Sequence, residues 1–128
     1  MASIRVLLAD DNEFFLEAAS QFLAQALLTV VGLAYTGREA VEQVNRLKPD
    51  LVLMDIAMPE MNGLEATRHI KAQPDPPRVI VLTLHDISAY AAEARAVGAD
   101  NLVTKTAMGV ELLPAINLLF ATQEPDIA

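Results

Sequence analysis

Short apolar runs alternate with longer segments of helical periodicity five times along the chain. The runs are nearly continuous and do not alternate with polar residues, which is typical of strands buried on both faces of a parallel sheet. Repeated strand–helix units favour an α/β domain in which helices cover both faces of a five-stranded parallel sheet. The predicted strands lie at residues 4–9, 29–34, 51–54, 79–83 and 101–104.

Caps and breakers mark the ends of the predicted helices. The second helix follows a capping box, Thr36-Gly37-Arg38-Glu39, in which the threonine and the glutamate satisfy N–H groups of the first turn. Pro114 would remove a hydrogen bond from a helix interior, so we expect the fifth helix to start near Val110 or Glu111. The predicted helices begin near residues 12, 36, 62, 87 and 110, and they end near residues 28, 48, 72, 97 and 121.

The net charge of −8 and the absence of cysteine exclude several classes of protein. An acidic domain does not by itself grip the phosphates of DNA, and a chain without cysteine forms neither disulfides nor thiolate metal sites. The first residues lack the pattern of a signal peptide, and no apolar run reaches the ~18 residues of a membrane span. We therefore expect a cytoplasmic protein that does not enter a membrane.

Five polar residues stand where predicted strands end. Asp10 and Asp11 follow the first strand, Asp55 follows the third, Thr83 ends the fourth and Lys105 follows the fifth. Ligands of open parallel sheets bind at the carboxyl ends of the strands, so we expect all five side chains at one edge. Each residue alone has a plainer interpretation, such as a helix N-terminus for the Asp pair, and only the combination favours a site.

The charges of this group suit a divalent cation and a phosphoryl group. Three carboxylates crowded together repel one another, and Mg²⁺ prefers oxygen ligands and commonly binds carboxylates together with phosphate. Three carboxylates, one lysine and one Mg²⁺ sum to zero charge. Because aspartate is an established nucleophile that forms an acyl phosphate, the pattern predicts phosphoryl transfer to Asp55.

Four stretches of the chain resemble the receiver domain family of two-component response regulators. They are VLLADDNEFF, LVLMDIAMPEMNGLEA, VIVLTLHD and VGADNLVTK, and they span nearly the whole sequence. The resemblance implies the (βα)5 fold of flavodoxin-like or CheY-like receivers. It also implies a receiver domain at residues 1–121, followed at 122–128 by a tail or the start of a linker.

The resemblance implies a role for each site residue. Asp55 is the phosphoacceptor, Thr83 bonds a phosphoryl oxygen and moves on activation, and Lys105 pairs with the phosphoryl group. Among the ligands of Mg²⁺, Asp11 binds directly and Asp10 acts mainly through water. The implied ligand set is Asp10, Asp11, Asp55 and the backbone carbonyl of Ala57.

The resemblance also implies partners. The phosphodonor is a sensor histidine kinase or a phosphotransfer protein. The stretches LTLHD and KTAMGVELLPAI resemble LuxR/NarL-type regulators, which control transcription through a C-terminal helix-turn-helix domain. DNA would be bound only by such an output domain, which is not in this chain. A stand-alone single-domain regulator is the alternative.

Two positions depart from the family pattern. Leu102 stands where receivers usually carry Tyr or Phe, which puts an aromatic switch coupled to Thr83 in doubt. Thr106 stands where many receivers carry a proline after a cis bond, so the loop after Lys105 is not fixed by the resemblance. These departures keep a docking module that acts without phosphorylation as an alternative function.

An enzyme acting on external substrates is disfavoured. A phosphohydrolase with an aspartate nucleophile would carry an Asp-x-Asp arrangement, and Ala57 stands two residues after Asp55. We expect a phosphoacceptor that dephosphorylates itself slowly. His85 either tunes the access of water to the acyl phosphate or is an ordinary loop residue.

Apolar residues surround much of the fifth helix, from Leu112 to Phe120. Only one face of a helix packs on the sheet. The remainder, with the fourth helix and the fifth strand, is a candidate face for a second receiver in a homodimer or for the output domain. Helix packing within the monomer is the alternative explanation.

Overall fold

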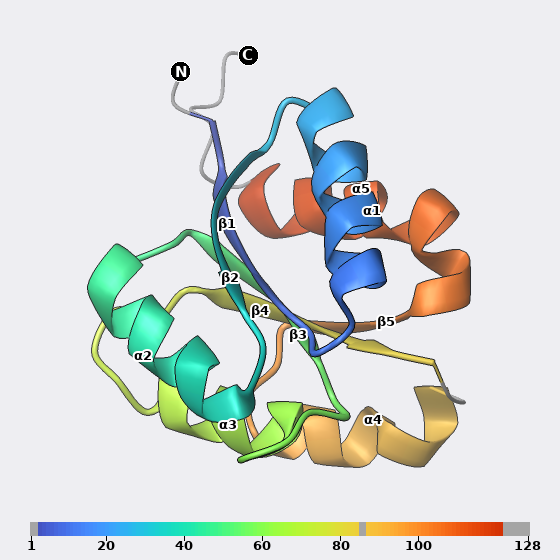
Figure 1. Cartoon of the computed structure of the whole chain (residues 1–128). Coiled ribbons are helices and arrows are strands. Elements are labelled where there is room, and N and C mark those ends of the chain that lie inside the picture. The colour runs from blue at the N-terminus through green and yellow to red at the C-terminus, as the bar shows by residue number, and fades with distance from the viewer. Residues whose placement is uncertain (1–2, 85–86, 122–128) are drawn as a thin grey trace.

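A five-stranded parallel sheet forms the centre of the protein (Figure 1). The computed structural model describes residues 3–84 and 87–121. Each predicted strand is confirmed to within one residue at either end, and the spatial order is β2-β1-β3-β4-β5. The strands are β1 (Arg5–Ala9), β2 (Thr29–Ala34), β3 (Leu51–Asp55), β4 (Arg78–Thr83) and β5 (Asn101–Thr104).

Helices cover both faces of the sheet, as expected. Helices α1 and α5 lie on one face, and α2, α3 and α4 lie on the other (Figure 1). Within the described residues no helix is both long and apolar enough to cross a membrane. The helices are α1 (Glu13–Gln25), α2 (Gly37–Leu47), α3 (Gly63–Lys71), α4 (Ile87–Ala96) and α5 (Met108–Phe120), and a 3₁₀ helix, η1 (Lys105–Ala107), precedes α5.

Two apolar clusters sandwich the sheet. Neighbouring residues of a strand point to opposite faces, so Leu7 and Val52 join the cluster under α2, α3 and α4. Leu8 and Leu53 join the cluster under α1 and α5. Because each central strand contributes to both clusters, the positions between its two ends are all apolar. This explains the continuous runs that predicted the strands.

Helices α1, α2 and α3 each begin with a side-chain cap. The side chains of Asn12, Thr36 and Asn62 each accept a hydrogen bond from the backbone N–H three residues later. The predicted capping box of α2 is confirmed, because the Glu39 carboxylate also accepts from the backbone N–H of Tyr35 at 2.7 Å. These caps fix where the chain enters each helix after leaving the sheet.

The first helix is shorter than predicted. It ends at Gln25 and not near residue 28, because Leu27 adopts a left-handed conformation with φ of 65°. The N–H of Leu28 then reaches back to the carbonyl of Leu23 at 3.0 Å and closes the helix end.

The expected late start of the fifth helix was wrong. Helix α5 begins at Met108, directly after η1, and Pro114 lies inside it. Val110 and Pro114 are both exposed, so water can bond the Val110 carbonyl that loses its N–H partner. A proline on the solvent side of a helix therefore does not force the helix to begin later.

Candidate functional site

The reversal of strand order places the candidate site. The chain runs from β1 to the outer strand β2 and then returns to β3 on the other side of β1. Strands β1 and β3 are thus neighbours from which the chain departs in opposite directions, and a crevice opens at their carboxyl ends. Asp10 follows β1 and Asp55 ends β3, so both stand at this crevice.

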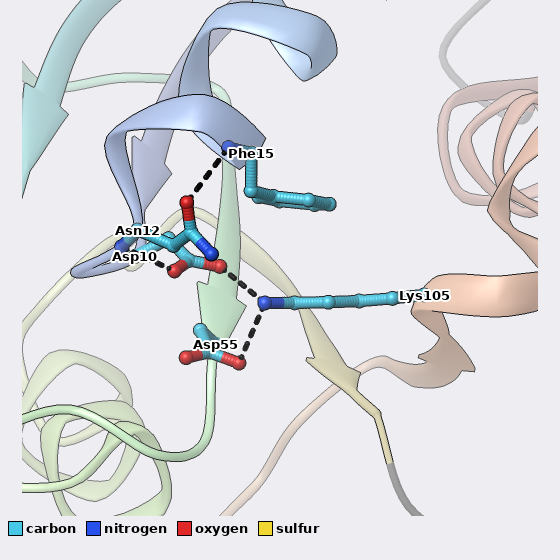
Figure 2. Close-up of polar contacts among 5 residues, drawn as sticks. All are labelled: Asp10, Asn12, Phe15, Asp55 and Lys105. Carbon is cyan, nitrogen blue, oxygen red and sulfur yellow. Dashed lines mark hydrogen bonds and ion pairs between the residues drawn. The ribbon is translucent and has the colours of Figure 1, made fainter.

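The turn after β1 orients Asp10. Its carboxylate accepts a hydrogen bond from the backbone N–H of Asn12 at 2.8 Å, and the Asn12 side chain accepts from the N–H of Phe15 at 3.1 Å (Figure 2). Asp10 is buried, whereas the neighbouring Asp11 is exposed. The cap of α1 and the orientation of Asp10 are therefore parts of one turn.

Lys105 connects the two buried carboxylates. Its Nζ lies 2.5 Å from Oδ2 of Asp10 and 3.3 Å from Oδ1 of Asp55 (Figure 2). Only 10% of the Lys105 side chain is exposed. A buried ammonium is stable only with close anionic partners, and here it has two.

The pKa of the Asp55 carboxyl is raised to about 6, against an ordinary value of 3.8, and burial is the largest cause. The negative charges of Asp10 and, to a smaller extent, Asp11 also raise this pKa, whereas Lys105 lowers it. The site thus carries more negative charge than its single lysine neutralises.

The three carboxylates form a group suited to a hard cation. Asp10, Asp11 and Asp55 each offer an oxygen, and these oxygens lie within 4.8 Å of one another. Oxygen donors at this spacing match the preference of Mg²⁺, and two charges remain once Lys105 has offset one. The residues present therefore fit the expected divalent metal.

A pocket of about 330 Å³ opens over these groups. Ala57 and Thr83 line it together with the three aspartates and Lys105, so the structure brings every predicted site residue to one place. Thr83 is buried at the end of β4, where it pairs with Thr104 of β5. Leu84 and Tyr90 complete the side of the pocket nearest α4.

Two glycines, for which the sequence predicted no role, allow close packing around the loop that follows Asp55. A Cβ on Gly63 would lie 1.9 Å from the backbone oxygen of Asp55, and one on Gly37 would lie 2.0 Å from that of Met61. Only glycine allows these close backbone approaches. A shared motif signals both positions, because Thr36-Gly37 and Asn62-Gly63 are each followed two residues later by glutamate.

The two departures from the family pattern have local structural outcomes. Leu102 is half-buried and packs, with Tyr90, against the apolar cluster under α4. The described backbone has no cis peptide bond, and the chain after Lys105 enters η1, whose first turn is capped by the Thr104 hydroxyl. His85 lies outside the described residues.

Comparisons with known proteins identify the family of the chain. The family model of the response regulator receiver domain matches residues 6–117. A two-component response regulator of the LuxR family from Aurantimonas sp. SI85-9A1 superposes with a TM-score of 0.88 at 33% identity, covering 94% of this chain and 87% of that chain.

Curated relatives include both longer proteins and one of similar length. Response regulator GacA of Pseudomonas viridiflava is 38% identical over 98% of this chain, which spans 60% of the length of GacA. Chemotaxis protein CheY of Thermotoga maritima is 37% identical over 88% of this chain and 94% of its own length. The fold and the acidic site define a signalling receiver. The chain belongs to the response regulator receiver domain family.

Proposed function

We propose that this chain is a phosphorylation-switched receiver in which Asp55 accepts a phosphoryl group from a sensor histidine kinase or a phosphotransfer protein. One observation carries the proposal: the buried Asp55 carboxylate shares Lys105 with Asp10 inside a cluster of three carboxylates. A purely structural aspartate would be fully paired, whereas this one faces a pocket with room for a phosphoryl group.

The transfer step balances without a further reactant. An oxygen of Asp55 attacks the phosphorus of phosphohistidine, an O–P bond forms as the N–P bond breaks, and the imidazole leaves with a proton from solvent. The Lys105 ammonium, 3.3 Å from Asp55, is placed to pair with the transferred phosphoryl oxygens. Thr83 at the pocket wall supplies a hydroxyl for another oxygen.

Asp10, Asp11, Asp55 and the backbone carbonyl of Ala57 would hold the metal. Bound Mg²⁺ would offset the charge of the phosphoryl oxygens and of the crowded carboxylates. Asp10 would then hold the cation, and the Lys105 ammonium would remain to pair with the phosphoryl group. Turnover on external substrates is not proposed, and slow self-dephosphorylation is.

The output of the switch is proposed to be transcriptional. GacA, of whose length this chain spans 60%, supports a receiver that belongs to a longer regulator. The resemblance to LuxR-type regulators supports an output domain that binds DNA. The match to nearly the full length of CheY from Thermotoga maritima favours the second candidate, a stand-alone regulator. Expression of the chromosomal gene product and its measured mass separate the two.

A homodimer through the α4–β5–α5 face is proposed as the form that phosphorylation favours. Helix α5 exposes Val110 and Leu118, at 79% and 74%, on the same side as the exposed Pro114. Apolar side chains in one stripe are stabilised by covering them. Light scattering over a dilution series should show a concentration-dependent mass after phosphorylation, and a monomer at every concentration would contradict the proposal.

Intact mass spectrometry after incubation with Mg²⁺ and acetyl phosphate tests the phosphoacceptor. We expect a gain of one phosphoryl group that is lost with EDTA and in Asp55→Asn. Asp75→Asn is the matched control, because Asp75 is exposed and has a positive φ that asparagine also adopts. Absence of labelling in the folded wild-type chain, or persistence in Asp55→Asn, would overturn the proposal.

A further inference from the structure

The aromatic ring of Phe15 lies against the ammonium of Lys105. Nζ stands 4.2 Å from the ring centroid, which is within the range of a cation–π interaction. Phe15 comes from the first turn of α1, and Lys105 follows β5, ninety residues later in the chain. The contact therefore exists only because the fold brings α1 and the end of β5 together (Figure 2).

Three groups of the described residues lie close to the ammonium of Lys105. Asp10 lies at 2.5 Å, Asp55 at 3.3 Å and the Phe15 ring at 4.2 Å. Two of these neighbours are charged groups that would gain new partners in the proposed reaction, whereas the ring is neutral. The ring is accordingly the neighbour whose own charge does not change when a cation or a phosphoryl group arrives.

We propose that Phe15 is a positioning residue that holds the Lys105 ammonium beside Asp55 and thereby sets the rate of its phosphorylation. This inference rests on the proposed phosphoacceptor function and adds a residue to it. Lysine is a flexible point charge, and a fixed ring face limits the positions it samples and excludes water from one side.

Asp10 cannot supply this positioning throughout the reaction. It is the closest partner of Lys105 and also one of the three carboxylates that fit a divalent cation. When its oxygens face a cation, their attraction for the ammonium falls. The ring then keeps Nζ near the Asp55 oxygen that carries the phosphoryl group.

The turn that orients Asp10 also orients the ring. The Asn12 N–H donates to Asp10 at 2.8 Å, and the Asn12 side-chain oxygen accepts from the backbone N–H of Phe15 at 3.1 Å (Figure 2). Two hydrogen bonds therefore connect the Asp10 carboxylate, through Asn12, to the backbone that carries the Phe15 ring. The neighbouring Phe14 points elsewhere, since 85% of it is exposed.

The test replaces the phenylalanine at 15 by ring-fluorinated phenylalanines, from one to three fluorines. Fluorine withdraws electron density from the ring face and weakens its attraction for a cation, while the size of the side chain changes little. Phe22 is the matched control, because it lies on the same helix and packs on the same apolar cluster. Labelling by acetyl phosphate at fixed Mg²⁺ is measured for each protein.

We expect the labelling rate to fall stepwise with fluorination at position 15, to about three- to tenfold below wild type for the trifluorinated ring. Phe15→Tyr should keep the rate, and Phe15→Leu should match the trifluorinated protein. Fluorination of Phe22 should leave the rate unchanged. Equal rates across the series at position 15 would overturn the inference.

Nuclear magnetic resonance gives a readout that does not depend on phosphorylation. The ring current of Phe15 should shift the Lys105 methylene protons next to Nζ upfield, and Phe15→Leu should remove the shift. Absence of the shift in wild type would also overturn the inference. The proposed function fails separately, since it requires labelling of the wild-type chain whatever the series at position 15 shows.

Discussion

Aspartates lie at both ends of the sheet, and they differ in whether each carboxylate has hydrogen-bond donors or cations of its own. At the amino ends of the strands, Asp100 accepts a hydrogen bond from the backbone N–H of Val79 at 2.8 Å and pairs with Lys71 at 2.7 Å and Arg78 at 3.5 Å. Asp50 accepts from the backbone N–H of Arg5 at 2.8 Å. Each carboxylate at this end thus has donors of its own.

At the carboxyl ends, three carboxylates lie close together, and two of them share one ammonium. Asp10 and Asp55 both lie within ion-pair distance of Lys105, and Asp11 stands beside them. The shortage of positive charge raises the free energy of the folded metal-free protein, and binding a cation or phosphoryl group relieves it. The same residue type therefore stabilises the fold at one end and creates a binding site at the other.

The largest effect on stability should come from the glycine that packs against Asp55. A Cβ on Gly63 would lie 1.9 Å from the Asp55 backbone oxygen, so Gly63→Ala must displace α3 or the strand end. We expect a loss of about 3 kcal/mol in the free energy of unfolding, measured by urea denaturation. Phosphorylation should slow as well, because Asp55 moves.

Gly109→Ala is the control for the glycine. Its added Cβ would meet no atom within 4 Å, and alanine favours a helix over glycine. A small gain in stability, with unchanged labelling, is expected. Equal stabilities of the Gly63→Ala and Gly109→Ala proteins would contradict the close packing at the carboxyl end.

The amino end is tested by Asp100→Asn. This change leaves Lys71 and Arg78 without a charged partner, so we expect a loss of about 2 kcal/mol in the free energy of unfolding. The rate of phosphorylation of the folded protein should not change. A slower rate of phosphorylation without a loss of stability would contradict this expectation, because it would show that a change at the amino end alters the site at the carboxyl end.

At the carboxyl end, the matched change Asp55→Asn should raise the free energy of unfolding and not lower it. Because the folded pKa of Asp55 is about 6 and its ordinary value is 3.8, the unfolded chain loses this proton first as pH rises. The stability that the neutral Asp55 carboxyl contributes is therefore fully present below pH 3.8, and it is lost as the pH rises through about 6. Asp55→Asn should therefore stabilise the metal-free protein above pH 6, by about 1–2 kcal/mol.

Unfolding of wild type and Asp55→Asn by urea, at pH values from 4 to 8, measures this difference. The gain should disappear toward pH 4, and saturating Mg²⁺ should reduce it at pH 8, because the ion binds the folded wild-type site. A gain that is the same at every pH, or a loss above pH 6, would contradict the charge imbalance.

The fold was predictable from sequence because strands buried on both faces leave a simple pattern. The continuous runs gave all five strands within one residue. The end of α1 was not predictable, since Leu27 takes a left-handed conformation without the glycine that normally signals it. The start of α5 predicted from Pro114 was wrong, because the free-energy cost of a proline inside a helix depends on whether the carbonyl that it leaves unpaired faces water.

The site was predictable as far as topology alone positions residues. The rule that strand carboxyl ends meet at one edge brought Asp10, Asp55 and Lys105 together without any tertiary detail. The contact of Phe15 with Lys105 was missed, because it depends on how a helix packs against a segment ninety residues away. The close approach at Gly63 was missed for the same reason, although its motif repeats that of Gly37.

The most direct test of the central claim locates the phosphoryl group on the chain. Protein labelled with acetyl phosphate and Mg²⁺ is reduced with borohydride, which converts an aspartyl phosphate to homoserine, and the peptides are then sequenced by mass spectrometry. We predict homoserine at position 55 and unmodified aspartate at positions 10, 11, 50 and 100. Homoserine at any of those four positions, with intact Asp55, would contradict it.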